Sequence, residues 1–391
     1  MGVGRFVYTP ILPLMHTQAG LSAGAGADLA TANYVGYLIG ALAGTLVPRL
    51  VGSSTVLRSS LLALVASLAG MALTQSTAVW LLLRLVAGAF SAMIFVIAVS
   101  ALLSHLREHP VHLPGWAFGG VGAGIALSGL LVLVLRAVGT WRSAWWASAA
   151  LAVLLTLAAW GLRPDPAVRR APTASGTESR PSGPRNHRWF SALFASYTLE
   201  GIGYIIAGTF LVAAINQTLP GSIGSGAWVL VGLAAIPSSA FWAGLGRRWS
   251  RPDLLLAALG VQAVGIALPA LAGGVAAALI SAVLFGATFI GVSTLALGTG
   301  AHLRFPRAVA LLTAGYSVGQ ILGPLVASPL LRHGYHQALL LSAAVVLAAA
   351  LAAFLLRIGF PHAMPEETDR AGGDRHTAPG AVQQAGSGSP S

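Results

Sequence analysis

The chain contains no cysteine and no lysine, and only 8% of its 391 residues are charged. Without cysteine, neither disulfide bonds nor thiol chemistry can be part of its mechanism. A soluble domain needs about 25% charged residues to cover its surface, so this class is excluded. Apolar residues make up 56% of the chain, which is typical of a polytopic membrane protein embedded in a lipid bilayer.

Motifs of nucleotide-driven and catalytic chemistry are also missing. The glycines of residues 119–124 follow no expected strand and precede no Lys-Ser or Lys-Thr pair, so they do not indicate a phosphate-binding loop. His105, His109 and His112 lack the cysteines or paired acids of a metal site. We therefore expect no enzyme, no cofactor, no metal and no nucleotide partner. The net charge of +12 could indicate nucleic acid, but its placement fits membrane topology better.

Twelve long apolar segments are present, separated by short polar ones. Each is too long and continuous for a strand, and lipid would leave an open sheet edge unsatisfied, so we expect transmembrane helices. The expected spans are residues 1–17, 29–47, 56–74, 78–103, 114–136, 142–162, 189–215, 225–245, 253–271, 275–298, 307–331 and 337–358. The first has only about 17 residues, the lower limit for a span. It also shows no signal-peptide cleavage site, so we expect the true start to lie upstream.

Arginine supplies all the fixed positive charge, and its distribution predicts the topology. With a cytoplasmic N-terminus, 17 arginines fall on the cytoplasmic side and only Arg136, Arg142 and Arg332 on the other. This strong positive-inside asymmetry predicts an inner-membrane protein with both termini in the cytoplasm. Arg5 and Arg84 are the two that lie within spans.

The spans fall into two groups of six. Residues 163–188 are rich in Arg, Pro, Ser and Gly, which predicts a flexible basic cytoplasmic linker between residues 1–162 and 189–358. Residues 359–391 are expected to form a disordered cytoplasmic tail.

The two groups also resemble each other. Residues 2–5 match residues 201–204 at a shift of 199, and four later matches follow in order at slowly drifting shifts of 200, 197, 197 and 194. A parallel repeat of six helices around a midplane site predicts two pseudo-symmetric six-helix bundles, the major facilitator architecture.

Individual stretches resemble the same superfamily and, within it, the YbfB/YjiJ-like transporters. The matching stretches are residues 4–9, 13–15, 30–37, 199–206, 285–289 and 319–324, and Arg84 with Gly88 resembles the superfamily's buried-arginine motif. The resemblance covers nearly all of residues 1–358 and implies a secondary transporter without a defined substrate. The superfamily's acidic loop motif is incomplete, because Pro48 and Arg248 stand at the acidic positions.

Glu200 is the one acid deep within a span. It lies eleven residues after Trp189, or about 16 Å along a helix, which is half of a ~30 Å hydrocarbon core. A carboxylate at this depth costs about 2.5–3.5 kcal/mol on insertion scales and usually serves function. Our hypothesis is that Glu200 carries a coupling proton and faces Arg5 across a central cavity, so that protonation frees Arg5 for an anionic group. The alternatives are a permanent structural ion pair between the halves and a protonated acid that is hydrogen-bonded to a neighbouring helix.

Other polar residues within the spans complete the predicted site. Arg84 either adds positive potential to the cavity or bonds carbonyl groups of a neighbouring helix. Two arginines against one acid favour an anionic or zwitterionic substrate. The remaining substrate-binding candidates are Tyr8, Asn33, Tyr34, Tyr37, Tyr204, Thr288, Tyr316 and Gln320, each of which alone is more simply explained by hydrogen bonding between helices. The candidates for gating and close packing are Gly122, Gly319, Gly323 and Pro324.

These observations predict a secondary transporter of a small organic molecule, with proton-coupled efflux as the first choice. Symport or uniport uptake of an organic anion is the alternative within this class. A membrane sensor or scaffold that transports nothing is the alternative of another class, but it would not need a deep carboxylate. An integral-membrane enzyme is disfavoured because His and acidic residues do not cluster at one membrane face.

Overall fold

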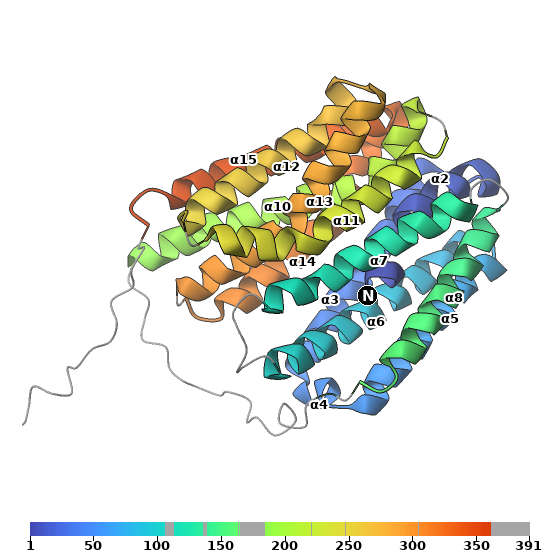
Figure 1. The fold of residues 1–391 in the computed structure, drawn as a ribbon, viewed down its shortest axis with the longest axis horizontal. Coiled ribbons are helices and arrows are strands. Elements are labelled where there is room, and N and C mark those ends of the chain that lie inside the picture. Colours follow the sequence, from blue (N-terminus) through green and yellow to red (C-terminus); the bar gives the residue numbers. More distant parts are fainter. Residues whose placement is uncertain are drawn as a thin grey trace, which may run out of the picture. The chain divides into compact units, whose positions relative to one another are not determined.

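The computed structural model describes residues 1–105, 113–135, 139–162, 164, 184–219, 221–246, 248–303 and 305–360. Within these residues the secondary structure is entirely helical, as expected (Figure 1). The helices are α1 (Gly2–Phe6), α2 (Tyr8–Ala19), α3 (Ala23–Leu46), α4 (Pro48–Val51), α5 (Ser54–Leu73), α6 (Thr77–His105), α7 (Leu113–Leu135), α8 (Trp141–Ala159), α10 (Pro184–Thr218), α11 (Ile223–Leu245), α12 (Arg251–Leu271), α13 (Gly274–His302), α14 (Ala308–Ala327), the 3₁₀ helix η1 (Ser328–His333) and α15 (Tyr335–Leu356).

Eleven of these helices, α3, α5–α8 and α10–α15, are long and apolar enough to cross a membrane. The first expected span instead consists of two consecutive helices, α1 and α2, which meet at Val7. The N–H of Val7 still donates to the carbonyl oxygen of Val3 at 3.0 Å, so the backbone stays helical across the junction. Pro10 has no N–H to donate to the carbonyl of Phe6, and this missing bond explains the interruption. The twelfth span stays a prediction.

Side-chain caps set several helix ends. α3 begins six residues before its expected start because Ser22 caps it, accepting the N–H of Ala25 at 3.1 Å. Thr140 and Ser143 form a reciprocal capping box at the start of α8. α2 ends at Gly20, whose left-handed backbone, with φ of 67°, suits a residue without a Cβ.

Helix α10 begins inside the expected linker, and the packed region ends inside the expected tail. α10 begins at Pro184, so residues 184–188 are helical and do not belong to the linker. Phe360 is 5% exposed and its ring lies 6.3 Å from that of Trp189, so the packed region includes the first two residues assigned to the tail. Apart from Pro164, residues 163–183 and 361–391 lie outside the described residues, and the predictions made for them remain predictions.

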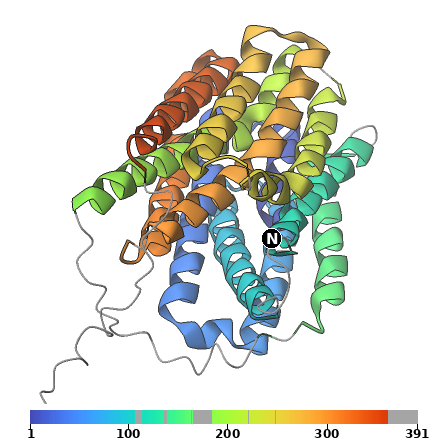
Figure 2. The same cartoon turned by 60° about the vertical axis from the view of Figure 1, so that its left-hand side comes forward.

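The helix at the centre of the packing is α10. In its most apolar window, 83% of the residues are buried, against 33–61% in the other ten spans. α10 contacts α15, α14 and α13 from the second half of the chain and α2 from the first (Figures 1 and 2). α3 packs on α6, and α5 packs on α6 and α8, while α7 contacts α11 and α3 contacts α14 between the halves. Residues 1–360 form one compact unit, and their division into two six-helix bundles stays a prediction.

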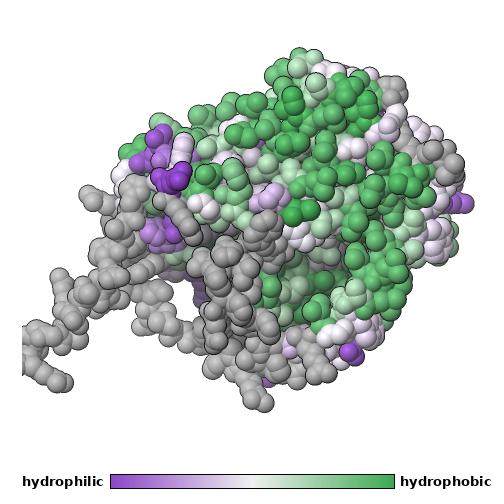
Figure 3. Space-filling view, in the orientation of Figure 1, coloured by the Kyte–Doolittle hydropathy of each residue, from purple (hydrophilic) through white to green (hydrophobic). Residues whose placement is uncertain are grey.

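The outer surface of this unit is apolar. Leu73 and Leu271 are 71% and 73% exposed, and many other large aliphatic side chains share this position. Figure 3 shows hydrophobic residues, in green, covering most of the visible described face, with hydrophilic residues at its margins. Such an area far exceeds the apolar patches of soluble monomers and is the surface that lipid covers.

Candidate functional site

Arg5 is a buried cation surrounded by aromatic rings. It lies on α1, is 5% exposed, and places its guanidinium 4.1 Å from the ring centroid of Tyr37, 5.3 Å from that of Tyr34 and 5.2 Å from that of Phe6. Its Nη2 donates to the hydroxyl of Tyr204 at 3.4 Å, and its Nε has no partner. Among the described residues, no carboxylate oxygen lies within 4.0 Å of Arg5. The charge is therefore held by aromatic rings and tyrosine hydroxyls.

Arg84 is a second buried cation, 1% exposed, on α6. Its Nη2 donates to the carbonyl oxygen of Arg5 at 3.4 Å, its guanidinium lies 4.7 Å from the ring centroid of Tyr8, and its Nε and Nη1 have no partner. Asn33 Nδ2 donates to the carbonyl of Arg84 at 2.9 Å. Of the two roles expected for Arg84, the geometry corresponds to bonding the backbone of a neighbouring helix.

Tyr204 on α10 joins Arg5 to the second half of the chain. Besides the Arg5 contact, its hydroxyl accepts Nε2 of Gln320 on α14 at 2.7 Å. Its ring stacks on Tyr316 at 5.4 Å and on Phe289 at 5.8 Å, with interplanar angles of 9° and 5°. These rings belong to a column from three helices, in the order Tyr197, Tyr316, Tyr204, Phe289 and Phe285.

Glu200 is completely buried on α10, one helical turn before Tyr204. Its Oε1 accepts Nε2 of Gln262 on α12 at 2.9 Å, and its Oε2 has no partner. The expected pairing with Arg5 is wrong for this structure, because the two side chains form no ion pair. Positions i and i+4 differ by about 40° around a helix. This rotation directs Tyr204 toward Arg5 and Glu200 toward α12.

The other predicted residues lie in different surroundings. Tyr34 shares a 3.0 Å hydrogen bond with Thr209 on α10, so it joins the two halves of the chain. Tyr8 donates to the carbonyl of Gly26, and Thr288 donates to the backbone of its own helix. Tyr8 therefore bonds a neighbouring helix, α3, whereas Thr288 bonds within α13.

Two contacts between the halves were not expected from the sequence. Thr9 on α2 donates to the carbonyl oxygen of Gly208 on α10 at 2.6 Å. Two turns further along α2, His16 hydrogen-bonds the hydroxyl of Tyr335 on α15. Together with Tyr34, they fasten α2 and α3 to α10 and α15.

The packing candidates lie at close helix contacts. A Cβ on Gly122 of α7 would lie 2.7 Å from the backbone nitrogen of Ile236 and 2.8 Å from the carbonyl oxygen of Gly232, both on α11. On α14, a Cβ on Gly319 would lie 2.5 Å from a carbonyl oxygen of α10, and one on Gly323 would lie 2.8 Å from another. Pro324 is buried in the same helix. Their geometry suits the expected role in close packing.

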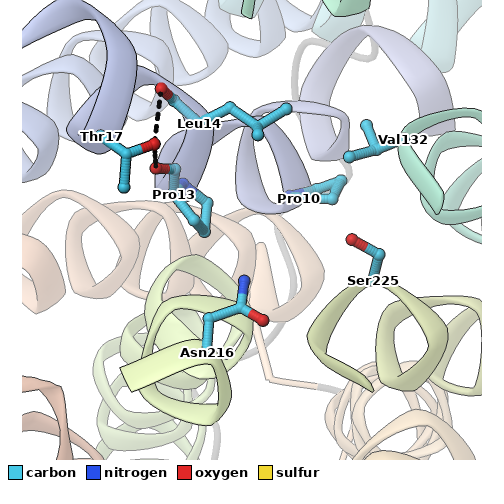
Figure 4. A pocket seen from close by; sticks show the side chains of 7 residues that line it. All are labelled: Pro10, Pro13, Leu14, Thr17, Val132, Asn216 and Ser225. Atoms are coloured by element: carbon cyan, nitrogen blue, oxygen red, sulfur yellow. Dashed lines mark hydrogen bonds between the residues drawn. The ribbon is translucent and has the colours of Figure 1, made fainter. Parts of the chain in front are cut away.

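A cavity of about 200 Å³ lies among α2, α7, α10 and α11 (Figure 4). It is lined by Pro10, Pro13, Leu14, Thr17, Val132, Asn216 and Ser225. Thr17 donates back to carbonyl oxygens of its own helix, at 3.1 Å to Pro13 and 3.3 Å to Leu14. None of the predicted site residues lines this cavity.

Gln262 is the functional candidate that the sequence reasoning missed. It is the only polar side chain between residues 254 and 271 of α12. A single amide in an otherwise apolar span is itself a signal of a buried partner, because an amide without one is costly to bury. Thr9 and Thr209 carried no comparable signal, since threonine commonly bonds its own helix backbone.

Comparisons with known proteins identify a family and structures with a similar fold. A family model described as "Uncharacterised MFS-type transporter YbfB" matches residues 1–354. No curated protein matches the chain. A crystal structure of a mutant of the nucleoside transporter NupG is similar, with a TM-score of 0.72 and 14% sequence identity, over 90% of this chain and 97% of that one. At this identity the similarity shows the fold alone.

Proposed function

The chain belongs to the major facilitator family described by the uncharacterised transporter YbfB, and from this premise we propose that it exports a small organic molecule by proton-coupled alternating access. Residues 1–162 would rock against residues 189–358 around a site at mid-depth. The arginine asymmetry supports an inner-membrane location with both termini in the cytoplasm.

One observation carries this proposal: helix α10 connects a buried acid, Glu200, to a buried cation, Arg5. Glu200 lies one turn from Tyr204 on α10, and the hydroxyl of Tyr204 contacts Arg5, which belongs to the other half of the chain. Binding of a proton at Glu200 would change the charge on α10 next to this contact. Binding of a solute at Arg5 would change the same contact from the opposite side. A shared contact of this kind is what coupling between two binding events requires.

The charge of the site favours one second candidate, the uptake of a small organic anion by symport or uniport. Arg5 and Arg84 are both at least 95% buried, and neither has an acidic partner among the described residues. A buried charge without a partner costs several kcal/mol, and an anionic solute group would offset part of this cost. Tyr37 and Tyr204 would then contact the bound anion beside Arg5.

The test begins with purified protein and a thermal-shift screen against a library of metabolites and drugs. A compound that raises the melting temperature is then offered to proteoliposomes that contain a pH-sensitive dye. We expect solute flux in one direction with proton flux in the opposite direction, and loss of the pH-gradient dependence in Glu200→Gln. Solute and protons moving together would identify the second candidate. Unchanged gradient dependence in Glu200→Gln would remove the coupling role of this residue. No flux of any compound that binds would support a sensor or scaffold.

A further inference from the structure

The contact between Glu200 and Gln262 leaves two buried oxygen atoms without a hydrogen-bond partner. Nε2 of Gln262 donates to Oε1 of Glu200 at 2.9 Å. Oε2 of Glu200 and Oε1 of Gln262 each have no hydrogen-bond partner, although both side chains are completely buried. A buried polar atom without a partner is costly, because it has lost its hydrogen bonds to water and gained none in exchange. The arrangement therefore needs an explanation.

Both unused atoms are acceptors as long as Glu200 is ionised. A carboxylate has only acceptor sites, and the amide oxygen of Gln262 is an acceptor as well, so neither can satisfy the other. A proton on Oε2 turns that atom into a donor. The acid and the amide then form two reciprocal hydrogen bonds, O–H to the amide oxygen and N–H to the acid oxygen. One proton thus satisfies both atoms.

Among the described residues, nothing charged faces this pair from the helices packed around it. The titratable side chains whose electrostatic interactions reach Glu200 are two phenols, Tyr197 on its own helix and Tyr316 on α14. α12 has its charged residues in its first turn, α13 has His302 at its end, and α15 has its titratable residues at its start. No ion pair joins Glu200 to Arg5 or to any other described arginine. The surroundings supply no cation that would favour the carboxylate.

We propose that Gln262 holds Glu200 as a neutral carboxylic acid in this conformation, through a reciprocal acid–amide pair that breaks when the proton leaves. The inference rests on the proposed function, in which Glu200 carries the coupling proton, and makes Gln262 its positioning residue. On release, the proton on Oε2 passes to water that reaches the site. The carboxylate then faces the Gln262 oxygen and turns away or forces the amide to rotate. Since the pair is completely buried here, release requires a change of conformation.

Infrared spectroscopy of the purified full chain tests this pair without any transport measurement. We expect wild type at neutral pH to show a protonated-carboxyl band that is lost in Glu200→Gln. In Gln262→Leu the band should remain but shift to higher frequency, because the acid loses both hydrogen bonds. Ser196→Ala is the matched control: Ser196 is a buried polar residue one turn away that bonds the carbonyl of Ala349, and its loss should leave the band in place. Absence of a Glu200-dependent band, or a band insensitive to Gln262→Leu, would overturn the proposal.

An exchange variant keeps the test decisive if Gln262→Leu does not fold. Glu200→Gln combined with Gln262→Glu restores one acid and one amide at the same contact, so the band should return at the wild-type frequency. Its absence in the folded double variant would refute the pair. The two proposals can also fail separately. If the band is normal but proton flux is the same in wild type and Glu200→Gln, the coupling role is refuted and the pair stands. If proton flux depends on Glu200 but the band is absent, the pair is refuted and the coupling role stands.

Discussion

Replacing Arg5 by methionine should abolish transport without a large loss of stability. An arginine at this depth costs about 2.5–3.5 kcal/mol on insertion scales. The nearest compensations are the Tyr37 ring at 4.1 Å, worth about 2 kcal/mol when desolvated, and one long hydrogen bond to Tyr204, worth about 1 kcal/mol, while the Tyr34 and Phe6 rings lie beyond 5 Å and add less. Gains and costs nearly cancel. Methionine reaches about as far as the Nε of Arg5 and removes both the charge and this Nε, which has no partner.

We therefore expect the free energy of unfolding of Arg5→Met to lie within about 1 kcal/mol of wild type, while solute flux disappears. The assay pairs the melting temperature of the purified protein with flux in proteoliposomes. Arg357→Met is the control. Arg357 pairs with Asp253 at 2.7 Å on the exposed surface, so its replacement should cost about 0–1 kcal/mol and leave flux intact. Destabilisation of Arg5→Met by several kcal/mol would refute this reasoning, because Arg5 would then be a structural residue.

Two further predictions concern helix contacts. Gly122→Leu should separate α7 from α11 and lower both flux and melting temperature, because a Cβ there would lie 2.7 Å from the backbone nitrogen of Ile236. Gly120→Leu is the control and should change the melting temperature little, because no atom lies within 4 Å of its Cβ. Equal melting temperatures of the two variants would show that the close contact is not required. Thr9→Val removes the 2.6 Å bond to the Gly208 carbonyl and should shift the conformational equilibrium by about 0.5–1.5 kcal/mol. Because the chain has no cysteine, a single cysteine introduced beside Gly208 can report this shift as faster maleimide labelling, and Thr17→Val, which loses only a bond within its own helix, should label as wild type.

The architecture was largely predictable because lipid permits few alternatives. Long apolar runs must be helical in a bilayer, and the runs predicted here became helices with ends within a few residues of expectation. The exceptions arose where apolarity carries little information. α3 begins at Ala23 because of the Ser22 cap, and α10 begins at Pro184, within a stretch whose composition indicated a linker.

The partners within the site were less predictable. Depth along a helix placed Glu200 and Arg5 at similar levels in the bilayer, and this stays a prediction, although both side chains are deeply buried within the protein. Which neighbour each side chain meets depends on how the helices are rotated and packed. Spacing alone put Glu200 and Tyr204 on one face, yet the first meets Gln262 and the second meets Arg5. Partners from other helices require the tertiary structure.

The bonds of Thr9, Tyr34 and His16 join segments 175–319 residues apart in sequence. If the two halves rock apart as rigid bodies, we expect all three bonds to be lost together, because each of them links one half to the other. The barrier to opening then reflects their combined strength, and a variant lacking any one of them should open faster but still as a single step. Opening kinetics with one exponential phase in every such variant would show that the three bonds break together in a single cooperative step.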